Sequence, residues 1–128
     1  MREPRWLAPA AVLIAHSESL ARFGGAAGVR DAGLRDSALA RPRNQFAYGQ
    51  TDLAALAAAY AYGIVRNHPF TDGNKRAGFL CAALFLELNG FVFAASEAET
   101  ALRTLALAAG EIGEEEYAVW LRANTRSS

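Results

Sequence analysis

The sequence is poor in the features that cross-link a protein or anchor it in a membrane. It contains one cysteine, Cys81, so a disulfide within the chain is excluded. Cys81 lies in the apolar run 77–88, which predicts a buried, unreactive thiol. The most apolar stretch, residues 53–65, is about 13 residues long, whereas a membrane helix needs about 20. The charged start of the chain does not resemble a signal peptide, so we expect a soluble cytoplasmic protein without membrane contact.

The chain also has no net charge, and it contains a single lysine. The 13 basic and 13 acidic residues cancel, so no overall field would attract nucleic acid, and we expect no direct nucleic-acid partner. All basic residues but one are arginine, and the exception is Lys75. A lysine offers phosphate a compact charge on a flexible stem. A lone lysine therefore indicates that position 75 specifically requires an ammonium group. Coincidence is the alternative explanation.

The hydrophobic pattern predicts one all-α domain over residues 1–128, a compact bundle of about six helices. Pro42 is expected to stop the second helix, residues 43–50 have no helical period, and Thr51 is the expected N-cap of the third helix. Because residues 77–88 are apolar almost all round, their helix is expected to form the buried centre. Residues 91–93 form a short extended piece. The expected helices are 9–22, 32–41, 52–67, 74–89, 96–109 and 114–124.

One stretch combines groups that handle phosphate. It reads His68-Pro69-Phe70-Thr71-Asp72-Gly73-Asn74-Lys75-Arg76, and no Gly-x-x-x-x-Gly-Lys-Ser/Thr run of a P-loop protein exists elsewhere. A loop that ends in glycine and enters a helix presents free N–H groups and the positive end of the helix dipole to an anion. Two cations at a helix N-terminus are unfavourable without an anion, so Lys75 and Arg76 support such a site independently.

Each polar residue of this stretch has an expected role. His68 is the predicted general base, because an imidazole can accept a proton at neutral pH. Asp72 is the predicted Mg²⁺ ligand, with an acid favoured by the helix dipole as the alternative. Gly73 is expected to let the backbone approach a phosphate closely. Asn74 is expected to cap the helix or to donate to a phosphate oxygen.

The remaining residues complete the expected site. Lys75 supplies a point charge, and Arg76 can bind two phosphate oxygens at once. Phe70 is expected to anchor the loop by burial, and Thr71 has no predicted role. The residues thus predict transfer of a phosphate-containing group from a nucleotide to a hydroxyl. His16, in the first helix, is expected to have a structural role at a surface or half-buried position.

The stretch resembles the Fic/Doc motif, His-x-Phe-x-(Asp/Glu)-(Gly/Ala)-Asn-(Gly/Lys)-Arg, at every specified position. Two residues make the stretch similar to the Doc (death-on-curing) branch. One is Lys75, and the other is Phe79, which stands where adenylate-transferring Fic enzymes have a further arginine. Segments 23–25, 33–42 and 86–90 also look like Doc segments. The resemblance implies the Fic/Doc fold and a toxin kinase. Such an enzyme uses ATP and Mg²⁺ to phosphorylate a hydroxyl of elongation factor Tu, which blocks translation, and a Phd-like antitoxin restrains it.

Two other functions stay open. A Fic-like adenylyltransferase would attach adenylate to a target hydroxyl, and Gly73, where some Doc proteins have Ala, is compatible with it. A non-enzymatic partner-binding domain is the third hypothesis, and the intact motif argues against it. Residues 43–50 are expected to form a flap over the site, in which Phe46 and Tyr48 contact target or nucleotide, with simple packing as the alternative. No Ser/Thr-x-x-x-Glu-Gly/Asn inhibitory segment occurs, so inhibition would come from another chain.

Overall fold

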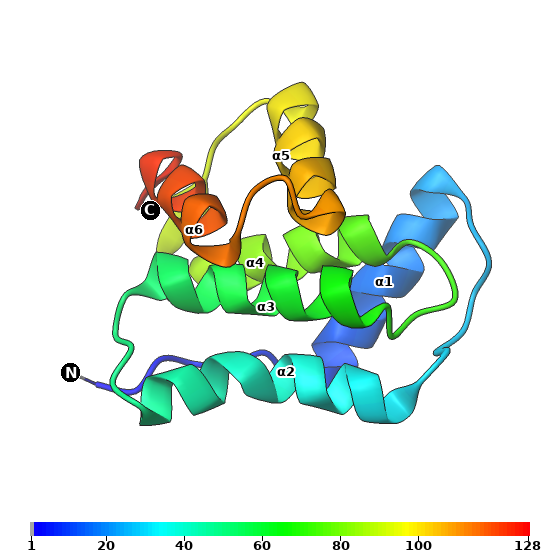
Figure 1. Cartoon of the computed structure of the whole chain (residues 1–128), viewed down its shortest axis with the longest axis horizontal. Helices are drawn as coiled ribbons and strands as arrows, with labels where there is room; N and C mark the ends of the chain where they lie inside the picture. Colours follow the sequence, from blue (N-terminus) through cyan, green and yellow to red (C-terminus); the bar gives the residue numbers. More distant parts are fainter. Residues whose placement is uncertain (1) are drawn as a thin grey trace.

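The computed structural model describes residues 2–128, which form six α-helices and one two-stranded antiparallel sheet (Figure 1). The all-α prediction is confirmed, with the small sheet as an addition. Within the described residues, none of the helices has both the length and the apolar character that a bilayer span requires. The elements are α1 (Pro9–Phe23), α2 (Ala32–Ala47), α3 (Leu53–Asn67), α4 (Asn74–Leu88), β1 (Phe91–Phe93), α5 (Glu97–Ala109), α6 (Glu114–Ala123) and β2 (Thr125–Ser127).

Two helices share the centre of the molecule, where one was expected. α4 is buried along one side, but α3 is buried over most of its surface and packs against α2, α4, α5 and α6 (Figure 1). Small side chains in α3 and α4 make this packing close. A Cβ on Gly63 of α3 would lie 3.1 Å from the Ala38 Cα, and one on Gly78 of α4 would lie 2.9 Å from the Val65 Cγ1.

Three details of the helix boundaries differ from expectation. Pro42 does not stop α2 but is buried inside it, because packing of the Ala38 and Pro42 face against α3 outweighs the lost hydrogen bond. Asp52, not Thr51, caps α3: its side chain accepts from the Ala54 N–H at 3.1 Å. The chain after α6 was not expected to be extended, and residues 125–127 pair with residues 91–93 to form the sheet.

Two connections meet at one end of the helical core. Residues 68–73, here called the motif loop, join the C-terminus of α3 to the N-terminus of α4. Residues 24–31, here called the cover segment, join α1 to α2 and run antiparallel to the motif loop (Figure 1). Val29 and Phe70 form a β-bridge, and the Thr71 N–H donates to the Gly28 carbonyl at 3.0 Å. The site residues are therefore held between α1, α3, α4 and the cover segment.

Candidate active site

His68 lies at the point where α3 ends. It is the C-cap residue, with φ 50° and ψ 55°, and its N–H donates to the Ile64 carbonyl at 3.1 Å. It is the single non-glycine residue with positive φ in residues 2–128. This left-handed conformation costs roughly 1–2 kcal/mol in a residue with a Cβ, so its surroundings must hold it. The residue is exposed, which leaves its imidazole open to a substrate.

Arg30 of the cover segment holds the backbone at His68. Its Nε donates to the His68 carbonyl at 2.7 Å, and its Nη2 donates to the Asn67 carbonyl at 2.9 Å. Carbonyls at a helix C-terminus lack intrahelical partners and carry the negative end of the dipole, so a guanidinium fork suits them. Arg30 also donates its own N–H to the Pro69 carbonyl at 2.7 Å. Reasoning from the sequence missed this residue, because its partners lie far along the chain.

Asn74 closes the motif loop from the other side. Its Oδ1 accepts from the Phe70 N–H and its Nδ2 donates to the Phe70 carbonyl, both at 3.0 Å. The same Nδ2 lies 3.5 Å from the His68 Nδ1. The side chain is buried and makes no capping bond to α4, so the expectation that it caps the helix is wrong. Its expected contact with a phosphate oxygen stays a prediction. The backbone N–H of Asn74 is what the residue can offer to an anion.

The aromatic residue of the motif packs on a histidine from α1. Phe70 is 1% exposed, and its ring stacks on the His16 ring with centroids 3.8 Å apart and 12° between the planes. His16 was expected at a surface or half-buried position, and this is wrong, because it is 5% exposed. Its Nε2 lies 2.7 Å from the Asp72 carbonyl oxygen. α1 therefore supports the motif loop from beneath.

Asp72 stands at the entrance of α4. Its Oδ1 accepts from the Gly73 N–H at 2.9 Å, and its Oδ2 accepts from the Ala26 N–H of the cover segment at 3.3 Å. No cluster of three or more His, Cys, Asp or Glu side chains that could hold a metal forms within residues 2–128. Asp72 can thus hold a metal only together with ligands such as phosphate oxygens and water, which is how Mg²⁺ is often bound.

The first turn of α4 presents donors to solvent. Gly73 is its N-cap in the left-handed region at φ 76°, and the first helical bond runs from the Ala77 N–H to the Gly73 carbonyl at 2.9 Å. The N–H groups before Ala77 therefore point out of the helix end. Lys75 and Arg76 are exposed there, and neither belongs to an ion pair in the described part of the chain. The Arg76 guanidinium lies over the Phe23 ring, 4.0 Å from its centroid.

Residues 43–50, which were expected to form a flap over the site, do not lie beside the motif loop. Phe46 is part of α2 and packs edge-on against Trp6, with centroids 5.8 Å apart. Tyr48 follows at the C-cap and is 93% exposed. Both lie where α2 ends, a few residues before α3 begins, whereas His68 follows the last residue of α3, about 22 Å further along a helix of this length. The cover segment, and not residues 43–50, lies beside the motif loop. From the sequence, the glycines of the cover segment had predicted only a loop.

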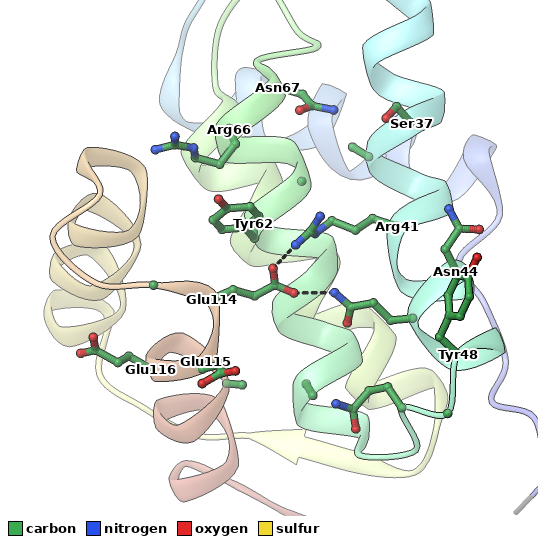
Figure 2. Close-up of a pocket in the computed structure, with 18 residues that line it drawn as sticks. Ser37, Arg41, Asn44, Tyr48, Tyr62, Arg66, Asn67, Glu114, Glu115 and Glu116 are labelled. Carbon is green, nitrogen blue, oxygen red and sulfur yellow. Dashed lines mark hydrogen bonds and ion pairs between the residues drawn. The ribbon is translucent and has the colours of Figure 1, made fainter.

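A separate groove of about 1110 Å³ runs along α3, between α2 and the start of α6 (Figure 2). Glu114 crosses it, where it pairs with Arg41 and accepts from the Gln45 Nε2 at 2.8 Å. The Arg41 guanidinium lies 4.8 Å from the centroid of the Tyr62 ring. None of residues 68–76 lines this groove, so it is not the place where the motif would hold a phosphate chain.

Comparisons with known proteins found a matching family model and similar proteins. The model of the Fic/DOC family matches residues 6–86. The chain is 34% identical over 119 residues to "Protein kinase doc" of Escherichia phage P1, an alignment that covers 92% of this chain and 94% of that protein. It is 45% identical over 76 residues to "Toxin Doc" of Mycolicibacterium smegmatis, which covers 57% of this chain and 58% of that protein.

Proposed function

Because the chain belongs to the Fic/Doc family, we propose that it is a Doc-type toxin kinase, which transfers a phosphate from ATP to a hydroxyl of a translation factor. The observation that carries the proposal is the placement of an exposed His68 next to the donor-rich N-terminus of α4. One loop thus joins a base to an anion site. The names of the two relatives, a protein kinase and a toxin, support the same reaction and role.

The N-terminus of α4 is the proposed triphosphate site. Backbone N–H groups of its first turn, together with Lys75 and Arg76, would bind the phosphate oxygens. The Asp72 carboxylate would hold Mg²⁺. Each of its two oxygens accepts one hydrogen bond from a backbone N–H and keeps a further lone pair for the ion. When bound, Mg²⁺ offsets the negative charge of the phosphates. Gly73 at φ 76° gives the chain its sharp turn into the helix.

His68 is the proposed general base. As the target hydroxyl attacks the γ-phosphorus, its proton passes to the imidazole, the new oxygen–phosphorus bond forms, and the bond to ADP breaks. Positioned proton transfer of this kind contributes roughly 10²–10⁴-fold to a rate. The backbone bonds from Arg30 and the side chain of Asn74 keep the imidazole at the mouth of the loop.

The target is proposed to lie along the cover segment. Residues 24–31 are exposed while one side of their backbone pairs with the motif loop, so a target segment could bind beside them in extended form. A hydroxyl on that segment would then face His68. The Doc resemblance supports an elongation factor Tu-like translation factor as the target, and a bacterial cytoplasm as the place of action.

A Phd-like antitoxin is the proposed partner. Three large apolar side chains of α1 are exposed, namely Leu13, Ile14 and Phe23, although α1 also supports the motif loop. An antitoxin segment that covers them would lie next to the proposed nucleotide site and restrain the enzyme. This supports inhibition by a separate chain.

Adenylate transfer is the competing reaction of the family. In Fic proteins that transfer adenylate, a further arginine follows the motif, but Phe79 stands at that position. Phe79 is half-buried and packs edge-on against Phe93, with centroids 5.2 Å apart. The proposed site therefore has Lys75 and Arg76 as its motif cations, which favours phosphate transfer.

The test is the intact mass of purified elongation factor Tu after incubation with the protein, ATP and Mg²⁺. The control is His68→Asn, because asparagine tolerates the left-handed backbone that His68 adopts. A gain of one phosphoryl group that the control does not produce supports the proposal. A gain of one adenylyl group would replace it with the Fic reaction, and an unchanged mass would refute the proposed target. Equal activity of the control would show that His68 is not the base.

A further inference from the structure

His16 is a buried histidine outside the motif that contacts the motif loop at two points. Its ring stacks on Phe70, at a centroid distance of 3.8 Å, and its Nε2 lies 2.7 Å from the Asp72 carbonyl oxygen. A Cβ placed on Gly73 would lie 3.5 Å from the same nitrogen. The side chain therefore spans the loop from the middle to the residue that opens α4.

The hydrogen bond has one possible direction. A carbonyl oxygen can only accept, so the His16 Nε2 carries the proton and donates it to Asp72. The carbonyl of Asp72 belongs to the same planar peptide as the Gly73 N–H, and the two groups point in opposite directions. That N–H donates to the Asp72 Oδ1 at 2.9 Å. Holding the carbonyl thus also sets the direction of the N–H and of the carboxylate.

We propose that His16 is a positioning residue for the nucleotide site: by fixing the Asp72–Gly73 peptide, it sets the orientation of the Asp72 carboxylate and of the first N–H groups of α4. The inference rests on the proposed function for the nature of the ligand, a Mg²⁺–nucleotide. His16 itself does not touch the reacting atoms, since α1 holds it beneath the loop at 5% exposure. Its effect passes through one peptide plane.

A series of variants separates the two contacts of His16. His16→Phe keeps an aromatic ring to stack on Phe70 but removes the donor to Asp72. His16→Gln keeps a donor N–H on a side chain of similar reach but removes the ring. Ile14→Phe is the matched control, because it adds a ring at an exposed position of the same helix. Circular dichroism and thermal unfolding identify any variant that fails to fold.

The first measurement is the Kd for Mg²⁺–ATP by calorimetry. We expect His16→Phe to raise it by about fivefold to tenfold, the effect of one lost hydrogen bond, and His16→Gln to stay within about twofold of the parent. In an Asp72→Ala background, His16→Phe should have a smaller further effect, because the carboxylate that His16 orients is gone while the backbone N–H groups remain. An unchanged Kd in His16→Phe, or a full additional loss in that background, overturns the proposal.

A second measurement does not depend on nucleotide. The Gly73 amide proton is observed by NMR, through its chemical shift and its exchange with solvent in the free protein. His16→Phe should shift this resonance and speed its exchange, and His16→Gln should restore both. If the parent protein does not bind Mg²⁺–ATP, the proposed function fails. The NMR signal of the Gly73 amide still tests whether His16 positions the Asp72–Gly73 peptide. A Gly73 resonance that is the same in all variants overturns that role.

Discussion

The Asn74 carboxamide bonds both backbone groups of Phe70, accepting from its N–H and donating to its carbonyl at 3.0 Å each. Phe70 is 1% exposed and Asn74 is 7% exposed, so water cannot easily replace either bond. The pair ties the first turn of α4 to the loop that carries His68. The conformation at His68 and the position of the proposed phosphate site therefore both depend on this side chain, among others.

Asn74→Asp is expected to destabilise the protein by about 1–3 kcal/mol. Aspartate has the same shape, but its carboxylate cannot donate, and it would face the buried Phe70 carbonyl with negative charge. The free energy of unfolding in urea measures the change. Asn44→Asp, on the exposed face of α2, is the matched control and should stay within about 0.5 kcal/mol of the parent. Equal effects of the two substitutions would contradict this account of the loop.

Arg30→Lys is expected to slow phosphate transfer by about tenfold or more while the protein stays folded. A lysine keeps the charge near the end of α3, but a single ammonium cannot reproduce the fork that bonds the Asn67 and His68 carbonyls. The rate of transfer at saturating ATP is the measurement. Arg35→Lys, at a residue that pairs with its neighbour Asp36, is the control and should change the rate less than twofold. An unaffected rate in Arg30→Lys would show that His68 does not need the fork.

The regular parts of the fold could be predicted because their signals are local. Five of the six helices follow from apolar spacing and from stops such as Gly110. Pro42 misled the prediction, because the packing of α2 on α3 outweighs a local helix breaker. β2 was missed because three residues carry no alternation and its partner, β1, is distant in sequence.

The motif could also be predicted, but its support could not. Residues 68–76 are contiguous, so their chemistry can be read directly from the sequence. Arg30 and His16 act on carbonyl oxygens of the motif loop, and a backbone acceptor leaves no trace in the sequence. The error for Phe46 and Tyr48 has a related cause, because a sequence does not show which end of α3 a neighbouring segment reaches.

Gly78→Ala is expected to destabilise the protein by about 1–2 kcal/mol, although alanine normally favours a helix by about 1 kcal/mol over glycine. The new Cβ would lie 2.9 Å from the Val65 Cγ1 and 3.1 Å from the Ala61 carbonyl, so α3 and α4 would have to separate. Urea unfolding measures the change. Gly33→Ala in the first turn of α2 is the control, because its Cβ meets only the Asp31 side chain. That variant should be neutral or more stable, and a stabilised Gly78→Ala would show that the two helices can move apart easily.

Alkaline pH is expected to weaken the fold, because burial raises the pKa of core groups that include Cys81, Tyr117 and Tyr60. Burial raises the pKa of the Cys81 thiol from 9.0 to about 12, and burial also raises the pKa of Tyr117 from 10.0 to about 12, against a lowering by the Thr104 hydrogen bond. Because the folded state binds these protons more tightly than the unfolded state, the stabilisation is complete below pH 9 and is lost as the pH rises toward 12. Thermal unfolding between pH 7 and pH 11 should show the loss.

Cys81→Ala provides the control for the alkaline effect. The variant is less stable at pH 7, since it leaves a small cavity, but its Tm should fall less steeply between pH 9 and pH 10. In the parent protein, a thiol reagent should react with Cys81 only after denaturation, because the residue is 0% exposed. Rapid labelling of the native protein would show that the α3–α4 core opens readily.

The final prediction concerns the ring beneath Arg76. The Phe23 ring lies 4.0 Å from the Arg76 guanidinium and 5.2 Å from that of Arg22, at the end of α1 nearest the proposed phosphate site. A cation–π contact at an exposed site contributes about 0.5–1 kcal/mol, so Phe23→Leu should raise the Kd for Mg²⁺–ATP by about twofold to fivefold.

Phe23→Tyr separates the aromatic face from simple apolar contact. Tyrosine keeps a ring of the same shape under both guanidinium groups, so its Kd should match that of the parent. Phe23 is 52% exposed, so neither substitution should change the free energy of unfolding greatly, and urea unfolding checks this. If tyrosine and leucine weaken nucleotide binding equally, the ring does not hold Arg76 in place. If only leucine weakens binding, α1 orients a motif cation directly, besides supporting the motif loop through His16.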